Sequence, residues 1–246
     1  MLYVRSLENK VIPISDINPA KNIPIISRLF IAFSSIIFLF FQPKNNLELI
    51  NYFYKFAAIP CEVMNNLPLA ANQFYNNNCN LPPDIFIFPD KNIILSIFIS
   101  LFLHANFLHV LGNLWSFWIF GNNVEDILGK FRFILFLILS GLFSIAGHSF
   151  LNSVNINPIV GSSGIVSALM GAYLYLFPNA RLLVLVPFGV LFPTTIKAKF
   201  FMIFWVNFTV CKLLFKVIIF HGEAHLSGFI FGYLFLKLLR FKRNLI

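Results

Sequence analysis

Six apolar runs recur along this chain, and each is long enough, or nearly long enough, to cross a bilayer as a helix. They cover residues 24–41, 107–127, 131–151, 161–176, 200–220 and 224–239. The fourth and the sixth are short, which suits helices buried inside a bundle. We therefore expect an all-α membrane protein in which six transmembrane helices form one bundle.

The composition favours the same class. The 246 residues are 59% hydrophobic and only 11% charged, whereas about a quarter of the residues of a soluble domain are charged. So little charge argues against disorder and against a nucleic-acid-binding module, in spite of the net charge of +9. It also excludes most soluble enzymes.

The segments between the apolar runs give the domain organisation. We expect residues 1–23 to be a cytoplasmic tail, residues 24–240 the membrane domain and residues 241–246 a second tail. Residues 42–106 form a long external loop between the first two helices. Within it, residues 93–103 are either an interfacial helix, which their short length favours, or a seventh span. Residues 182–192, which contain Pro187 and Gly189, form a membrane-surface loop or instead a re-entrant segment.

Lysine and arginine set the expected orientation. With six spans, 13 of the 18 basic residues fall on the side that carries both termini, so we expect both termini in the cytoplasm. Lys212 and Lys216 fit this arrangement poorly. The N-terminus has no short apolar core followed by a small-residue cleavage site, so we expect no removed signal peptide. The expected location is the inner (cytoplasmic) membrane of a bacterium.

Three cysteines are too few for a disulfide framework. Cys61 and Cys79 lie in the same polar stretch and can pair if it faces an oxidising space. Cys211 lies in an apolar run.

The polar residues that could take part in catalysis or binding gather in the first turns of the second, fourth and sixth runs. In the expected topology these three runs all enter the membrane from the outer face. Polar groups inside a membrane are costly and are functional by default. Ser163, Ser167 and Gly171 form one helical stripe, and Ala224, His225, Gly228 and Gly232 form another. Small residues let membrane helices approach closely. If the two stripes face each other, Ser163 and His225 meet, and the imidazole can accept the proton of the serine hydroxyl.

A site for a developing oxyanion is also predicted. His109 and Asn113 are four residues apart on one helical face and both can donate hydrogen bonds. Ser163 lies at a helix N-terminus, where free backbone N–H groups favour negative charge. No carboxylate is well placed to orient His225, so we expect a dyad.

Simpler interpretations exist for each residue taken singly. His104 precedes its helix and can tie down the long loop, while Glu125 can form hydrogen bonds at the cytoplasmic boundary. His221 and His225 have a spacing that can chelate a metal or a haem, but Gly222 stands where the zinc-protease signature needs glutamate. The joint occurrence of serine, histidine and donors at one depth favours the catalytic interpretation.

Residues 54–239 resemble the rhomboid family of intramembrane serine proteases. The matching motifs are His104-Ala-Asn-Phe-Leu-His109-Val-Leu-Gly-Asn113, Phe120-Gly-Asn-Asn-Val-Glu125-Asp-Ile-Leu-Gly129, Gly161-Ser-Ser163-Gly164 and Ala224-His225-Leu-Ser-Gly228-Phe-Ile-Phe-Gly232. The order and spacing of these motifs make the resemblance highly specific.

The resemblance implies Ser163 as nucleophile, His225 as general base, and His109, Asn113 and the Ser163 backbone N–H as oxyanion donors. It implies structural roles for His104, Glu125, Gly161, Gly164, Gly228 and Gly232. The implied substrates are transmembrane segments of other proteins, cut near the outer face, and no metal or other cofactor is implied. The sequence leaves the physiological substrate and the oligomeric state open.

This chain departs from the family pattern at two positions near the site. Ser167 stands where many members have an aromatic residue that packs on the catalytic histidine, and Ser227 stands where glycine or alanine is usual. Two other functions fit the sequence less well. A proteolytically silent relative, which only binds membrane clients, usually lacks the serine or the histidine, and both are present here. A transporter is expected to have internal repeats and interrupted helices with ionisable groups at mid-membrane, whereas this sequence has no evident repeat and its polar residues gather near one face.

Overall fold

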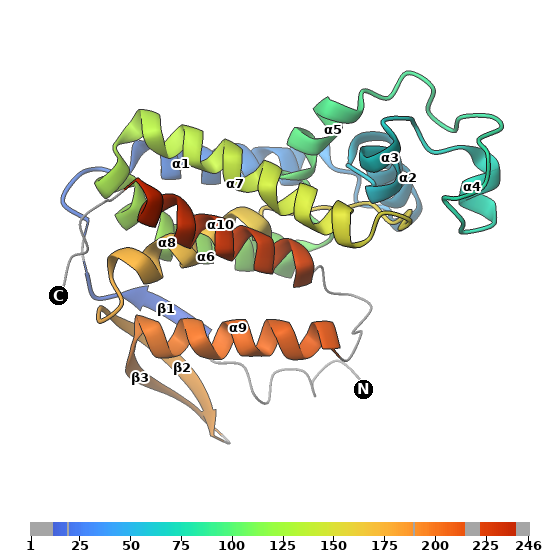
Figure 1. Ribbon diagram of the computed structural model, residues 1–246. Coiled ribbons are helices and arrows are strands. Elements are labelled where there is room, and N and C mark those ends of the chain that lie inside the picture. The colour runs from blue at the N-terminus through green and yellow to red at the C-terminus, as the bar shows by residue number, and fades with distance from the viewer. Residues whose placement is uncertain (1–11, 19, 189, 215–221, 240–246) are drawn as a thin grey trace.

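The computed structural model describes all residues except 1–11, 19, 189, 215–221 and 240–246. The described part is mostly helical (Figure 1). The long helices run side by side: α1 (Ile25–Ile36, continued by a π-helical turn, η2, Ile37–Phe41), α6 (Phe107–Leu128), α7 (Lys130–Leu151), α8 (Ser163–Leu176), α9 (Ala198–Leu214) and α10 (Gly222–Leu238). Part of the fifth predicted run, with Lys216, lies outside the described residues, as does His221 directly after it.

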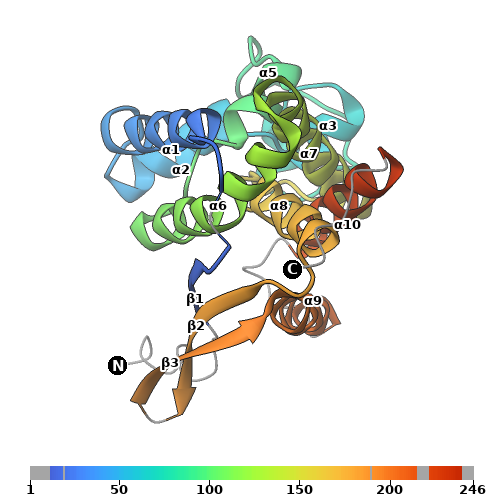
Figure 2. The ribbon, with the colours of Figure 1, turned by 90° about the vertical axis from the view of Figure 1, so that its left-hand side faces the viewer.

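Helix α8 occupies the interior of the bundle, as Figure 2 shows when the helices are viewed nearly end-on. Nearly all of its side chains are buried, and the ring of Tyr173 is completely so. The outward faces of the neighbouring helices expose large apolar side chains, such as Phe131 and Phe150 on α7. An apolar exterior around a packed helical interior suits a lipid environment.

Only α7 is both long and apolar enough to cross a bilayer among the helices of the described residues. Shorter apolar helices lie at Ile25–Phe41, Ser163–Leu176 and Ala198–Cys211. The six-span count therefore stays a prediction.

Local sequence explains where the long helices begin and end. The side chain of Asn106 accepts a hydrogen bond from the His109 backbone N–H at 2.9 Å and so caps α6. Gly129, with a φ of 72°, separates α6 from α7 because few other residues adopt a left-handed backbone without strain. The N-terminus of α1 has no cap of its own and is capped by Glu125 of α6. Its two carboxylate oxygens accept bonds from the backbone N–H groups of Ile26 and Ser27, at 2.9 and 2.8 Å.

The fold is not purely helical, and this corrects our expectation. A three-stranded antiparallel sheet contains β1 (Ile12–Asp16), β2 (Arg181–Phe188) and β3 (Val190–Lys197) (Figure 1). Strands β2 and β3 are neighbours in the sheet, and their pairing begins with Arg181 opposite Lys197. Strand β1 pairs with the other edge of β2, where Asp16 lies opposite Leu182. Residues 182–192 were predicted to be a membrane-surface loop or a re-entrant segment, and residues 12–16 fall in the predicted cytoplasmic tail, for which no strand was expected. The leucine- and valine-rich run of β2 is compatible with a strand, and it forms one here because β1, which is distant in sequence, supplies hydrogen-bond partners along the edge that β3 leaves open.

Strand β1 is attached to the helices by Asp16. Its carboxylate accepts hydrogen bonds from the Tyr173 hydroxyl of α8, at 3.1 Å, and from the Asn123 amide of α6. Burial raises the pKa of the Asp16 carboxyl to about 6. The indole N–H of Trp115 on α6 also donates to the carbonyl of Pro13, at 2.9 Å.

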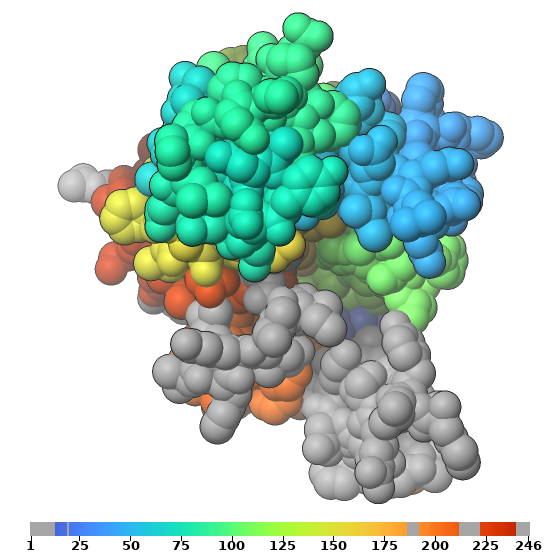
Figure 3. All heavy atoms as spheres, turned by 90° about the vertical axis from the view of Figure 1, so that its right-hand side faces the viewer, coloured from blue at the N-terminus to red at the C-terminus, as the bar shows by residue number. Residues whose placement is uncertain are grey.

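The long segment 42–106 folds over one end of the bundle (Figures 1 and 3). It contains α2 (Asn46–Phe56), α3 (Pro60–Asn65), α4 (Ala71–Tyr75) and α5 (Ile93–Ser100). Residues 93–103, predicted to be an interfacial helix or a seventh span, thus contain a helix of only eight residues. That length is far short of a bilayer crossing.

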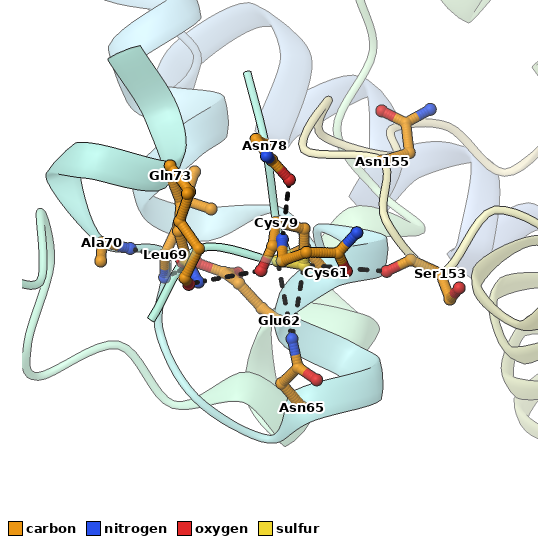
Figure 4. Close-up of a disulfide and its surroundings, with 12 residues drawn as sticks. Cys61, Glu62, Asn65, Leu69, Ala70, Gln73, Asn78, Cys79, Ser153 and Asn155 are labelled. Atoms are coloured by element: carbon orange, nitrogen blue, oxygen red, sulfur yellow. Dashed lines mark hydrogen bonds between the residues drawn. A yellow bond between two sulfur atoms is a disulfide. The ribbon is translucent and has the colours of Figure 1, made fainter. Parts of the chain in front are cut away.

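The disulfide that the sequence allowed, between Cys61 and Cys79, closes this segment (Figure 4). The amide of Asn65 approaches both sulfur atoms, at 3.8 Å from Cys61 and 3.3 Å from Cys79. Beside the disulfide, Glu62 and Lys91 form an ion pair at 2.5 Å, and both side chains are only 2% exposed. Burial raises the pKa of Glu62 and lowers that of Lys91, while the mutual attraction of the two charges opposes both shifts.

Candidate active site

Ser163 and His225 are brought together by the close packing of α8 on α10. A Cβ atom added at Gly228 would lie 2.2 Å from the carbonyl oxygen of Gly164, and one added at Gly232 would lie 1.9 Å from that of Ala168. The two helices therefore touch backbone to backbone, as glycine stripes permit. In this packing the Oγ of Ser163 lies 2.8 Å from the Nε2 of His225.

The first turn of α10, which carries His225, is held by contacts with α7. The hydroxyl of Ser144 on α7 donates to the carbonyl of Ala224 at 2.9 Å, which fixes the first turn of α10. Glu223 is the carboxylate nearest to His225 in sequence, but its Oε2 lies 3.3 Å from the Nδ1 of His148 on α7. Glu223 thus has a histidine partner other than His225.

His109 and Asn113 of α6 lie next to Gly161, just before the first turn of α8. A Cβ atom at Gly161 would lie 2.8 Å from the Nε2 of His109 and 3.3 Å from the Nδ2 of Asn113. Gly161 has a φ of 115°, a backbone conformation that other residues rarely adopt. The structure thus brings together four residues predicted for the site: Ser163, His225, His109 and Asn113.

Two of these side chains have a donor directed toward the site. The Nδ1 of His109 accepts the backbone N–H of Ala105 at 3.4 Å, so the neutral ring carries its proton on Nε2, the atom that faces Gly161. The side-chain nitrogen of Asn113 is buried and has no hydrogen-bond partner among the described residues. A buried amide without a partner is costly, and a ligand oxygen between these donors would satisfy it.

His104 connects the long segment to the start of α8. Its Nδ1 lies 3.1 Å from the Phe102 carbonyl and its Nε2 lies 3.4 Å from the hydroxyl of Ser162. Its backbone N–H and carbonyl both bond to the amide of Gln42, at 2.8 Å each. The ring is completely buried, and this burial lowers the pKa of His104 to about 4, so the imidazole is neutral. These contacts suit the structural role that was expected for His104.

Sequence reasoning missed two neighbours of the site. Gln42 follows the first apolar run and gives no local signal that it binds the backbone of His104. Trp205 of α9 packs on the ring of His225, with 6.0 Å between ring centroids, and aromatic residues are too common in this chain to single it out. Among the described residues, no group of three or more histidine, cysteine, aspartate or glutamate side chains is arranged to hold a metal ion.

The fold and the site describe an apolar helical bundle in which a serine and a histidine from different helices form a hydrogen bond near one end. Comparison with known proteins gives the family. The model of the Rhomboid domain matches residues 91–242, well over half of the chain. The chain belongs to the rhomboid family, whose members are embedded in membranes.

Curated relatives agree with this assignment. The chain is 32% identical to the mitochondrial Rhomboid protein 1 of Saccharomyces cerevisiae over 96 residues, which are 37% of this chain and 28% of the relative. It is 41% identical to the rhomboid protease GlpG of Yersinia enterocolitica over 70 residues, 28% of this chain and 24% of the relative. GlpG of Yersinia pestis is 40% identical over the same length. The matched regions span about a quarter of the length of these relatives.

Proposed function

We propose that this chain is an intramembrane serine endopeptidase that cleaves transmembrane segments of other membrane proteins near the outer face. The observation that carries the proposal is the distance of 2.8 Å between the Oγ of Ser163 and the Nε2 of His225. A serine hydroxyl is a weak nucleophile until a neighbouring base accepts its proton. Membership of the rhomboid family and similarity to relatives named as proteases support this activity.

In the proposed reaction, the Oγ of Ser163 attacks the carbonyl carbon of the scissile peptide bond while the Nε2 of His225 takes the hydroxyl proton. The imidazolium then gives this proton to the leaving amine, and the acyl group stays on Ser163. Water, with His225 again as the base, hydrolyses the ester and restores the serine.

The oxyanion that forms during each attack is assigned to three donors: the Nε2–H of His109, the Nδ2–H of Asn113 and the backbone N–H of Ser163. The Asn113 amide has no other partner among the described residues, so the donor is available without breaking a bond. A donor that is already oriented stabilises charge without reorganisation, and its loss costs about 10²–10³ in rate.

The proposed topology follows the orientation of the basic residues. Residues 24–240 form a six-span membrane domain, with segment 42–106 outside and both termini in the cytoplasm, in the inner membrane of a bacterium. In this arrangement Ser163 and His225 lie close to the external leaflet, and the disulfide between Cys61 and Cys79 belongs to an oxidising compartment.

The test is cleavage of a fluorogenic transmembrane substrate by the purified protein in proteoliposomes. We expect cleavage by the wild type and none above background by Ser163→Ala or His225→Ala. Ser140→Ala is the matched control, because Ser140 is a buried serine whose hydroxyl donates to the carbonyl of Leu137 on its own helix at 3.0 Å. Cleavage that survives both substitutions contradicts the dyad, and a folded wild type without activity toward any transmembrane substrate contradicts the protease function.

A further inference from the structure

The imidazole of His225 packs against an indole from a different helix. The ring centroids of Trp205 on α9 and His225 are 6.0 Å apart, with an angle of 35° between the planes. The same indole stacks on Phe229, one turn further along α10, at 5.9 Å and 27°. Trp205 therefore contacts two successive turns of one face of α10, and His225 is the first of these contacts.

The facing position on α8 offers the imidazole no aromatic ring. Ser167 lies one turn after Ser163 and is buried, and its hydroxyl donates to the carbonyl of Ser163 at 2.7 Å. This bond ties the side chain back to its own helix. The aromatic contact that restrains the ring of His225 thus comes from α9.

We propose that Trp205 is a positioning residue for His225: its indole holds the imidazole with Nε2 toward Ser163 and stabilises the imidazolium that forms when the serine proton is transferred. The catalytic part of this inference rests on the proposed function. An indole face attracts a cation at this distance, so the contact strengthens when the imidazole becomes charged. The same contact makes the orientation of the base depend on the position of α9.

The contact can be tested without any protease activity, because an imidazolium quenches the fluorescence of an adjacent indole. Emission of the wild type is followed between pH 4 and 9 in detergent and compared with Trp205→Phe and His225→Ala. In the described structure the imidazole of His225 faces the hydroxyl of Ser163 on α8, and the titratable pair Glu223–His148 joins the first turn of α10 to α7. His148→Gln is therefore the matched control, since it removes the other nearby imidazole.

We expect a component of the emission that falls as the pH is lowered, that is absent from both Trp205→Phe and His225→Ala, and that remains in His148→Gln. A component that persists in His225→Ala, or that disappears in His148→Gln alone, overturns the contact. This result is independent of whether the protein cleaves any substrate.

Kinetics then test the positioning role. In proteoliposomes, we expect Trp205→Leu to lower kcat about tenfold with little change in KM, and Trp205→Phe to stay within about threefold of the wild type, because the phenyl ring keeps an aromatic face. The pH below which activity is half lost should also fall in Trp205→Leu, because the imidazolium is less favoured without the aromatic face and the base stays neutral to lower pH. A wild-type kcat and pH profile in a folded Trp205→Leu variant overturn the positioning role. An inactive wild type that still has the fluorescence component instead contradicts the proposed function.

Discussion

Replacement of Gly228 by alanine should separate the two helices that carry the proposed dyad. The added Cβ would lie 2.2 Å from the Gly164 carbonyl oxygen and 3.1 Å from the carbonyl carbon. Carbon–oxygen contacts between helices are normally about 3.3–3.6 Å, so α10 must move away from α8 by about 1 Å. The obstacle is backbone rather than a flexible side chain, and it cannot be relieved by a rotamer change.

His225 lies three residues before Gly228 on the same helix and moves with it. The distance of 2.8 Å between the Ser163 Oγ and the His225 Nε2 would lengthen by up to about 1 Å, beyond hydrogen-bonding range. Because a displacement of about 1 Å can cost 10²-fold in rate, we expect kcat/KM for a transmembrane substrate to fall about 100-fold. The assay is steady-state cleavage in proteoliposomes, with circular dichroism to establish that the variant is folded.

Gly112→Ala is the control for this experiment. Gly112 is an exposed glycine of α6, and a Cβ atom there would meet nothing within 4 Å. We expect Gly112→Ala to keep wild-type activity. If Gly228→Ala does the same, the proposal that direct backbone contact sets the Ser163–His225 geometry is refuted.

Three further predictions address other parts of the molecule. Asn113→Ala should lower kcat by about 10²–10³ with little effect on KM in the same cleavage assay, and an unchanged kcat would remove Asn113 from the oxyanion site. The pKa of Asp16 is raised by burial to about 6, so its contribution to the stability of strand β1 is complete below about pH 4 and is lost as the pH rises through 6. Hydrogen exchange of the β1 amides should accelerate over this range beyond its intrinsic pH dependence, and Asp16→Asn should abolish that excess; an identical profile in the variant would contradict the assignment. Lys91→Met leaves Glu62 buried without its partner and should destabilise the protein by about 3–5 kcal/mol in chemical denaturation, whereas the double variant with Glu62→Leu should lose less. Equal losses in the single and double variants would contradict the claim that an unpaired buried charge causes the loss in Lys91→Met.

The parts of the fold that were predictable are those with local signals. The apolar runs 107–127 and 131–151 correspond to α6 and α7 within one residue at each end, because Asn106 caps one helix and Gly129 separates the two. The meeting of Ser163 with His225 was predictable from two stripes of small residues, since only such stripes permit close helix contact.

The unpredicted parts depend on contacts that are distant in sequence. The sheet joins residues 12–16 to residues 181–197, and neither segment alternates polar and apolar residues in a way that marks a strand. The packing of Trp205 on His225 depends on the rotation of α9 about its axis, which no periodicity in a uniformly apolar helix specifies. The pairing of Cys61 with Cys79 was possible from the sequence but depended on how segment 42–106 folds.

The most direct measurement of the proposed chemistry is covalent labelling of the folded protein with a fluorophosphonate, followed by mass spectrometry of the peptides. A serine activated by a histidine at 2.8 Å reacts with this electrophile, while ordinary serines do not. We predict a single phosphonate adduct on Ser163, absent from Ser163→Ala and strongly reduced in His225→Ala. An adduct on another residue, or labelling of Ser163 that is unaffected by the loss of His225, would contradict a catalytic serine–histidine dyad.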